Sequence, residues 1–141
     1  MEMAFVGHPQ LHRKRKYRLD ELSEMELLTF QKGSQPHVTL LDRFRQHQME
    51  PKRVHAISSI SAMVQLVQGG FGVALLPKAA IRRMTGFTGL KLLSCDAKLQ
   101  ALPIHASYRN DPTSQTVETV LQSALAFVSG ASKAPKRGLK G

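Results

Sequence analysis

The hydrophobic and polar residues of this chain follow two different periods, and each change of period marks a predicted element. Short apolar runs that end at turn residues predict strands, and they cover Met3–His8, Glu26–Phe30, Arg53–Ser58, Gly72–Leu76, Leu90–Cys95 and Leu102–Arg109. Apolar residues that recur every three or four positions predict helices, which begin near residues 19, 36, 60, 78 and 114. Strands and helices that alternate in this way predict an α/β fold with a mainly parallel central sheet flanked by helices.

The helices are expected to begin at residues whose side chains satisfy free backbone N–H groups. The candidate caps are Asp20, Ser34 or Gln35 ahead of Pro36, the serines at 58, 59 and 61, and Thr113 or Ser114. The same pattern predicts which side of each long helix is buried. The second helix has apolar positions at Val38, Leu41, Phe44 and Met49, the third at Ile60, Met63, Val64 and Val67, and the last at Val117, Val120, Leu121, Ala124 and Val128.

Three glycines lie close together in the stretch VQLVQGGFGVALLPKAA, from Val64 to Ala80. A dinucleotide-binding loop needs G-x-G-x-x-G after a strand and at the start of a helix. Here the third glycine is missing, and the segment leaves a helix to enter a strand. The pattern therefore indicates a helix end in left-handed conformation followed by a tight entry to a strand, with Pro77 opening the next helix.

The net charge of +10 permits an acidic partner, but the excess is local. HRKRKYR (His12–Arg18) carries five basic residues and the C-terminal KAPKRGLKG carries four, while basic and acidic residues nearly balance elsewhere. The favoured interpretation is that both segments are flexible and solvated, with residues 131–141 a disordered basic tail. A functional contact with an anion is the alternative. The few aromatic residues argue against base stacking.

Candidate chemistry is sparse. Cys95 is the single cysteine and is expected to be a buried strand residue, and the six histidines lack metal-ligand spacing. No nucleophile has a local base and orienting group, so no catalytic residue, metal or cofactor is predicted, and no enzyme. The start of the chain does not read as a signal peptide and no apolar run is long enough to span a membrane, which favours a cytoplasmic protein.

SSISAMVQLVQGGFGVALLPKAA resembles the central stretch of the effector-binding domain of LysR-type transcriptional regulators from bacteria. AFVGHPQL, YRLDELSEMELLTFQKGS and IHASYRND resemble further parts of that domain in the same order. The resemblance implies a periplasmic-binding-protein-like fold of type 2 within residues 1–130. It implies a second lobe at about 9–102, hinge strands at about 3–8 and 103–108, and a lobe-one helix at about 113–129.

The family's winged helix-turn-helix and the first part of lobe one have no counterpart in this sequence, so the chain is expected to be a truncated form. The resemblance implies a homo-oligomer for the full-length protein and DNA contact only through the missing N-terminal domain. The alternatives are a solute-binding protein of a transport system, for which an export signal is lacking, or a basic nucleic-acid-binding protein that uses HRKRKYR.

In open parallel sheets, ligands bind beyond the carboxyl ends of the strands, where helix N-termini favour anions. Two loops of this chain fit that position, and the resemblance places both on the cleft between the lobes. The predicted effector-binding residues are Lys32, Gly33, Ser34, Gln35, Ser58, Ser59 and Ser61. The predicted effector is a small organic anion, and ordinary helix capping is the alternative role for each residue.

Overall fold

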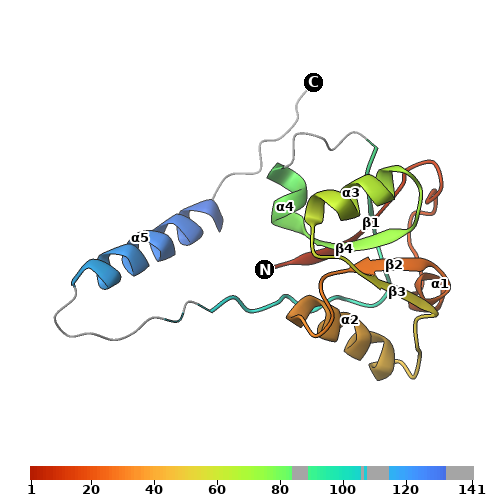
Figure 1. Ribbon diagram of the computed structural model, residues 1–141, viewed down its shortest axis with the longest axis horizontal. Coiled ribbons are helices and arrows are strands. Elements are labelled where there is room, and N and C mark those ends of the chain that lie inside the picture. Colours follow the sequence, from red (N-terminus) through yellow and green to blue (C-terminus); the bar gives the residue numbers. More distant parts are fainter. Residues whose placement is uncertain (84–88, 106, 108–114, 133–141) are drawn as a thin grey trace. The chain divides into compact units, whose positions relative to one another are not determined.

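The computed structural model describes residues 1–83, 89–105, 107 and 115–132 (Figure 1). The chain divides into two compact units, Met1–Ile104 and His105–Gly141. The first unit contains a five-stranded sheet and four helices, and the second contains one described helix. The basic C-terminal segment, residues 133–141, lies outside the described residues, and so do the predicted caps Thr113 and Ser114.

The elements follow the order expected from the sequence. The strands are β1 (Met3–Gly7), β2 (Glu26–Thr29), β3 (Arg53–Ala56), β4 (Val73–Pro77) and β5 (Lys91–Leu93). The helices are α1 (Leu19–Ser23), α2 (Gln35–Gln46), α3 (Ile60–Gln68), α4 (Lys78–Arg83) and α5 (Gln115–Ser132). Pro77 ends β4 instead of opening α4. No strand lies in the described residues between Leu102 and Ser107, so the predicted strand over Leu102–Arg109 is wrong there.

The sheet is mixed, with the strand order β3-β2-β4-β1-β5. β2 pairs in parallel with both β3 and β4, whereas β1 lies antiparallel to β4 and β5. Four of the five strands therefore run in one direction and β1 runs against them. The predicted α/β class is confirmed, and the carboxyl ends of β2, β3 and β4 share one edge of the sheet.

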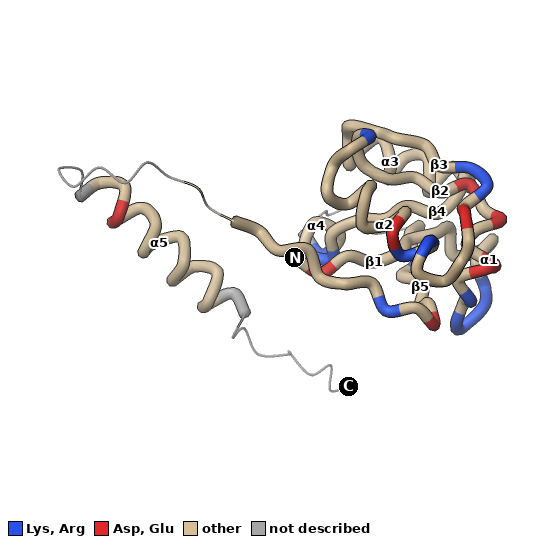
Figure 2. The backbone as a smooth tube through the Cα atoms, turned by 90° about the horizontal axis from the view of Figure 1, so that it is seen from below, with Lys and Arg blue, Asp and Glu red and all other residues tan. Residues whose placement is uncertain are grey.

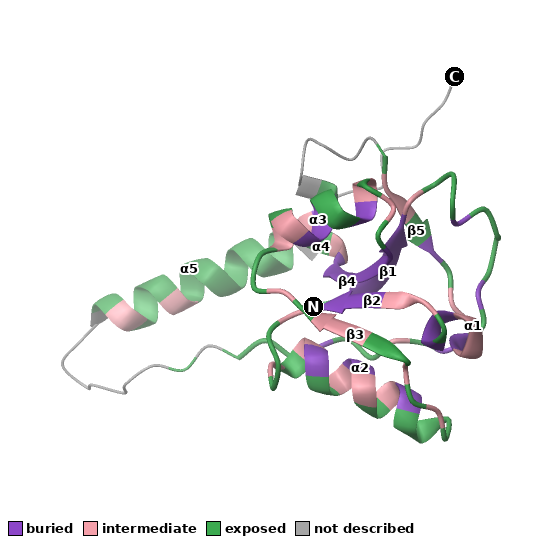
Figure 3. Ribbon diagram, turned by 45° about the vertical axis from the view of Figure 1, so that its right-hand side comes forward, coloured by how far each residue is buried: buried purple, intermediate pink, exposed green. Residues whose placement is uncertain are grey.

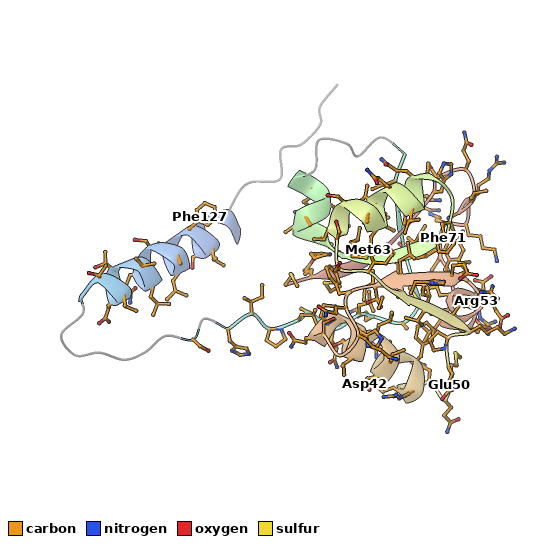
Figure 4. All side chains as sticks on the ribbon, viewed as in Figure 1. Asp42, Glu50, Arg53, Met63, Phe71 and Phe127 are labelled. Carbon is orange, nitrogen blue, oxygen red and sulfur yellow. The ribbon has the colours of Figure 1, made fainter. Side chains whose placement is uncertain are left out.

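Helices cover both faces of the sheet, and each face has its own apolar core (Figure 3). Leu40 and Phe44 of α2 pack with alternate strand residues such as Phe5 and Leu75 on one face. The other face packs beneath α3, which contributes Met63, Val64 and Val67 as predicted. Figure 4 shows Met63 between α3 and the sheet.

The apolar face predicted for α2 is wrong in part. Val38 is 43% exposed, whereas Leu40 and His37 are buried beside Phe44. The buried positions 37, 40 and 44 keep a helical spacing, and the predicted apolar positions left out both His37 and Leu40. A histidine that is buried in the first turn of a helix needs polar groups around it.

Asp20 is the second residue of α1 and does not cap it, contrary to the sequence prediction. The N–H of Leu19 donates instead to Oδ1 of Asp96, at 3.0 Å. Glu21 Oε2 accepts a hydrogen bond from the N–H of Arg18 at 2.9 Å, so this backbone group at the start of α1 is also satisfied. Asp96 lies 77 residues further along the chain, so local sequence could not identify it as the cap.

The glycine-rich segment is a joint between a helix and a strand, as predicted. Gly69 ends α3, and Gly70 has a φ of +81°, which an L side chain rarely adopts. A Cβ at Gly72 would overlap with the backbone carbonyl oxygen of Glu26 on β2. Residue 72 therefore has to be glycine because β2 and the start of β4 approach closely, not because a phosphate binds there.

The basic segment His12–Arg18 is ordered, which corrects the expectation of a flexible loop. Tyr17 is 4% exposed, and it forms a backbone bridge with Cys95 just beyond β5. Lys91 Nζ donates to the carbonyl oxygens of His12 and Lys14, at 2.8 and 3.1 Å. The basic residues of the segment are exposed, and Figure 2 shows this basic stretch of the backbone beside α1. Lys14 pairs with Glu21, and Arg18 pairs with Asp20.

Helix α5 spans 18 residues and confirms the predicted last helix. Large apolar side chains on it are exposed, and they are Val120, Leu125, Phe127 and Val128. Val117 and Leu121 are half-buried. Taken by itself, α5 therefore leaves Val120 and Val128 of the predicted stripe exposed.

Candidate functional site

The two predicted effector loops follow neighbouring parallel strands, so the structure brings their starting points together at one edge of the sheet. The N–H of Ile57, just after β3, donates to the carbonyl oxygen of Thr29, the last residue of β2, at 2.8 Å. From this edge the chain turns into α2 on one face and into α3 on the other. Two helix N-termini therefore flank the carboxyl ends of β2 and β3.

The first loop, between β2 and α2, is largely exposed to solvent, although Oγ of Ser34 is buried. Lys32, Gly33 and Gln35 are exposed and Ser34 is half-buried. Gly33 has a φ of +81°, and nothing lies within 4 Å of the place where a Cβ would be. The glycine thus serves the backbone turn, and the space beside it is open. The loop closes through the N–H of Ser34, which donates to the carbonyl of Gln31 at 2.9 Å.

Three buried side-chain atoms at this position have no hydrogen-bond partner among the described residues. They are Oγ1 of Thr29, Oγ of Ser34 and Nδ1 of His37. Thr29 is fully buried and His37 is 8% exposed. Buried polar groups in folded proteins are nearly always satisfied. Three such atoms within nine residues make the end of β2 and the first turn of α2 the candidate position for a polar ligand group.

Ser34 occupies the N-cap position of α2, but its hydroxyl accepts no hydrogen bond from the helix. The capping role that competed with ligand binding is therefore not supported at Ser34. Sequence reasoning missed Thr29 and His37 as site residues. Thr29 reads as an ordinary strand residue, and the only available signal for His37 was its place one residue after Pro36.

The second loop, between β3 and α3, behaves differently. Ser58, Ser59 and Ser61 are all exposed. Ser59 caps α3, because its Oγ accepts from the N–H of Ala62 at 3.3 Å. This serine has the ordinary structural role that the sequence left open. Its loop contributes exposed hydroxyl groups beside the β2 edge, and the buried unsatisfied groups belong to the first loop.

The electrostatics of this edge favour an anion. Neither α2 nor α3 has an acidic residue in its first turn, so the positive end of each helix dipole is not neutralised from within the helix. Lys32 adds a positive charge beside the first loop. A small carboxylate at this edge would meet the positive end of α2 and the charge of Lys32, while the hydroxyl oxygens of Thr29 and Ser34 are closed to solvent.

A second charged cluster lies at the opposite, amino end of β2 and β3. Glu26 Oε2 is 2.6 Å from Nε2 of His55, and Glu26 also pairs with Arg53. The hydrogen bond from His55 lowers the pKa of the Glu26 carboxyl. Phe71 stands edge-on against the His55 ring at a centroid distance of 5.2 Å. Every group in this cluster has a partner, so it reads as a structural network.

Metal and membrane chemistry find no support in the described ranges. No three His, Cys, Asp or Glu side chains there gather in a way that could hold a metal ion. None of the helices within those ranges combines the length and apolar content needed to span a bilayer. Cys95 lies just beyond β5 and is half-buried, not a buried strand residue as expected.

Comparison with known proteins identifies the type of domain. Residues 1–128 match the family model of the LysR substrate binding domain. No curated protein sequence matches the chain. Because the family model covers most of the chain, it also confirms the expected periplasmic-binding-protein-like α/β fold.

Solved structures share this fold. The Synechocystis PCC6803 CcmR regulatory domain in complex with 2-PG is 17% identical with a TM-score of 0.66, over 93% of this chain and 62% of that one. The BenM effector binding domain with its effector benzoate is 15% identical with a TM-score of 0.60, over 99% and 65%. Corynebacterium glutamicum OxyR, in a hydrogen-peroxide-bound variant, is 24% identical with a TM-score of 0.59, over 70% and 33%.

Two further matched chains are also covered over less than half of their length. The effector binding domain of a BenM variant is covered over 45% of its length, and a full-length BenM mutant over 34%. The chain thus spans between about a third and two thirds of the structures that it matches. At these identities the likeness establishes the fold, while ligands and partners have to be argued from this chain's own residues.

Proposed function

The chain belongs to the LysR substrate-binding domain family, and from this premise we propose that it is the ligand-sensing module of a bacterial transcriptional regulator. Its effector is a small organic anion that binds at the carboxyl ends of β2 and β3. The regulator as a whole acts in the cytoplasm as a homo-oligomer and contacts DNA through a separate N-terminal domain. The chain itself carries out no catalytic step.

One observation carries this proposal. Thr29 Oγ1 at the end of β2, and Ser34 Oγ and His37 Nδ1 at the start of α2, are buried and have no hydrogen-bond partner among the described residues. Leaving one buried polar group unsatisfied costs about 1–3 kcal/mol, and three such costs at one sheet edge need a compensating function. A ligand that supplies hydrogen-bond partners to these groups regains part of that free energy on binding.

The chemistry of the ligand follows from the groups around it. The α2 N-terminus and Lys32 supply positive potential for a carboxylate, and a shift of the first loop on binding would bring the buried hydroxyls of Thr29 and Ser34 into reach as donors. Benzoate and 2-PG, the molecules bound in the BenM and CcmR structures, are both small organic anions, which supports this class of effector. The family match does not support either alternative from the sequence, a transport solute-binding protein or a basic nucleic-acid-binding protein.

Isothermal titration calorimetry with benzoate tests this function, with neutral benzamide as the control ligand. We expect benzoate to bind and benzamide not to bind. Ser34→Ala should weaken benzoate binding about tenfold, since one hydrogen bond to a charged ligand is worth roughly 1.5 kcal/mol or more. Thr39→Val, on the outer side of α2, is the matched control and should leave the affinity unchanged. Equal affinities for benzoate and benzamide, or an unaffected Ser34→Ala variant, would refute the proposed site.

A further inference from the structure

The sheet has a gap on the β5 side of β1. β5 pairs with β1 from Gly7 to Phe5, where Phe5 faces Leu93. The chain then leaves the sheet and returns at Leu102, which exchanges two backbone hydrogen bonds with Met1. An uninterrupted antiparallel ladder would place Ala97 opposite Met1, because each step along β1 advances β5 by one residue. The intervening segment is therefore five residues longer than the ladder needs.

Met3 lies at this gap, and its backbone N–H and C=O groups face the gap. The N–H of Lys78 donates to the carbonyl of Glu2, and Met3 pairs with Pro77 across β4. Alternate residues of a strand direct their N–H and C=O groups to opposite sides, so Glu2 and Ala4 face β4. The N–H and C=O of Met3 then face the opposite side, between the last pair of β5 and the pair at Met1. This is a ladder position that β5 does not reach.

A pocket of about 330 Å³ occupies the gap. Its apolar walls belong to the core on the α2 face and include Phe5, Leu93 and Leu99. Phe5 and Leu93 are buried and fixed by the sheet register, so this wall is preformed. The volume is at the lower end of the range for small-molecule sites, which suits a ligand with one short apolar group.

The charged residues that line the pocket are both lysines, Lys78 and Lys98. Lys78 Nζ is held by Glu2 Oε2 at 3.0 Å, so part of its charge is neutralised. Lys98 forms no ion pair in the described part of the chain, and no carboxylate lines the pocket. The pocket therefore combines an apolar wall, one free positive charge and a strand edge with a donor and an acceptor.

We propose that this pocket is a second ligand site, for a small carboxylate that carries an apolar group and an amide, as in an N-acylated apolar amino acid. The amide pairs with the free backbone edge of Met3, in the manner of a short added strand. The apolar group packs against Phe5 and Leu93, and the carboxylate meets Lys98. Both sites lie in the sheet unit, at different strands, and this inference does not depend on the effector site at β2.

Cys95 makes the site measurable. It lines the same pocket, is half-buried, and is the only cysteine of the chain. A bound ligand should shield its thiol from a labelling reagent, and the labelling rate should fall by the factor 1 + [L]/Kd. The probe is N-acetyl-L-leucine, and its neutral carboxamide is the matched control. Burial raises the pKa of the Cys95 thiol, so all labelling is done at one pH.

We expect N-acetyl-L-leucine to slow labelling in a saturable way with a Kd on the order of 1 mM, and the carboxamide to protect much less. Lys98→Ala should weaken protection about fivefold, whereas Lys32→Ala, at the effector loop, should leave it unchanged. Ser94→Phe, at an exposed pocket residue, should block the probe without disturbing the core. Circular dichroism of each variant checks the fold.

Three results would overturn the inference. The first is that N-acetyl-L-leucine does not protect Cys95 from labelling even at its solubility limit. The second is that the acid and the carboxamide protect Cys95 equally. The third is that Lys98→Ala and Ser94→Phe leave the protection of Cys95 intact. Failure of the proposed effector site looks different. In that case Ser34→Ala would not change the affinity for benzoate, whether or not N-acetyl-L-leucine protects Cys95 from labelling.

Discussion

Thr29→Val is the substitution that most sharply separates stability from ligand binding in this chain. Thr29 is the last residue of β2 and is fully buried, and its hydroxyl has no partner in the described residues. Valine has nearly the same shape and the same β-branched preference for strands. The substitution thus removes one unsatisfied hydroxyl and changes little else.

The expected gain follows from the cost of burying that hydroxyl. An unsatisfied buried polar group costs about 1–3 kcal/mol, and replacement by an apolar group of the same shape recovers part of it. We expect Thr29→Val to raise the free energy of unfolding by about 1 kcal/mol, or to shift the urea midpoint upward by roughly 0.5 to 1 M. The same change should weaken benzoate binding about tenfold, since the ligand loses a donor.

Urea titration followed by circular dichroism gives the stability, and calorimetry gives the affinity. Thr39→Val, at a half-exposed position of α2, should change the stability by less than about 0.5 kcal/mol. A Thr29→Val protein that is less stable than the parent by 1 kcal/mol would show that the hydroxyl is satisfied in the free protein. The reasoning about a site prepared for a ligand would then be refuted.

Three further predictions concern the rest of the chain. Gly72→Ala should lower the urea midpoint more than Gly33→Ala, because a Cβ at Gly72 overlaps with a carbonyl of β2, whereas at Gly33 it meets open space and costs only the strain of a φ of +81°; equal losses would contradict this. The pKa of Glu26 is lowered in the folded chain by the His55 hydrogen bond, so its contribution to stability is present above the ordinary carboxyl pKa and is lost as pH falls through the lowered value. Glu26→Gln should therefore flatten acid unfolding while Glu50→Gln should not, and parallel pH profiles would rule the pairing out. Val120→Asp should reduce self-association of the chain in sedimentation, since burying each exposed apolar side chain is worth roughly 1.5–3 kcal/mol, and a strictly monomeric parent chain with α5 helical would show that the stripe does not drive association.

The order of elements could be predicted because it depends on local periodicity. The stripe of α3 and the joint at the glycines are visible in consecutive residues, and both were found where the sequence placed them. The direction of β1 was not visible, because strand pairing is decided by long-range contacts. The same limit explains the cap of α1, which Asp96 provides from a distant part of the chain.

The candidate site was predictable at the level of loops and not of individual groups. Parallel strands bring their carboxyl ends together, so the loops after β2 and β3 could be paired in advance. Which hydroxyl caps a helix and which stays free depends on side-chain orientation, and Ser34 and Ser59 look equivalent in the sequence. The buried positions of Thr29 and His37 result from packing on the α2 face, which periodicity alone did not resolve.

Backbone amide shifts mapped during a benzoate titration would show whether an anion binds at the carboxyl ends of β2 and β3. We expect the first and largest saturable shifts at Gly33–Gln35, with a second group at Ser59–Ser61, and we expect benzamide to leave both groups unchanged. Shifts at saturating benzoate that map instead to the basic segment His12–Arg18 would contradict the proposed anion site.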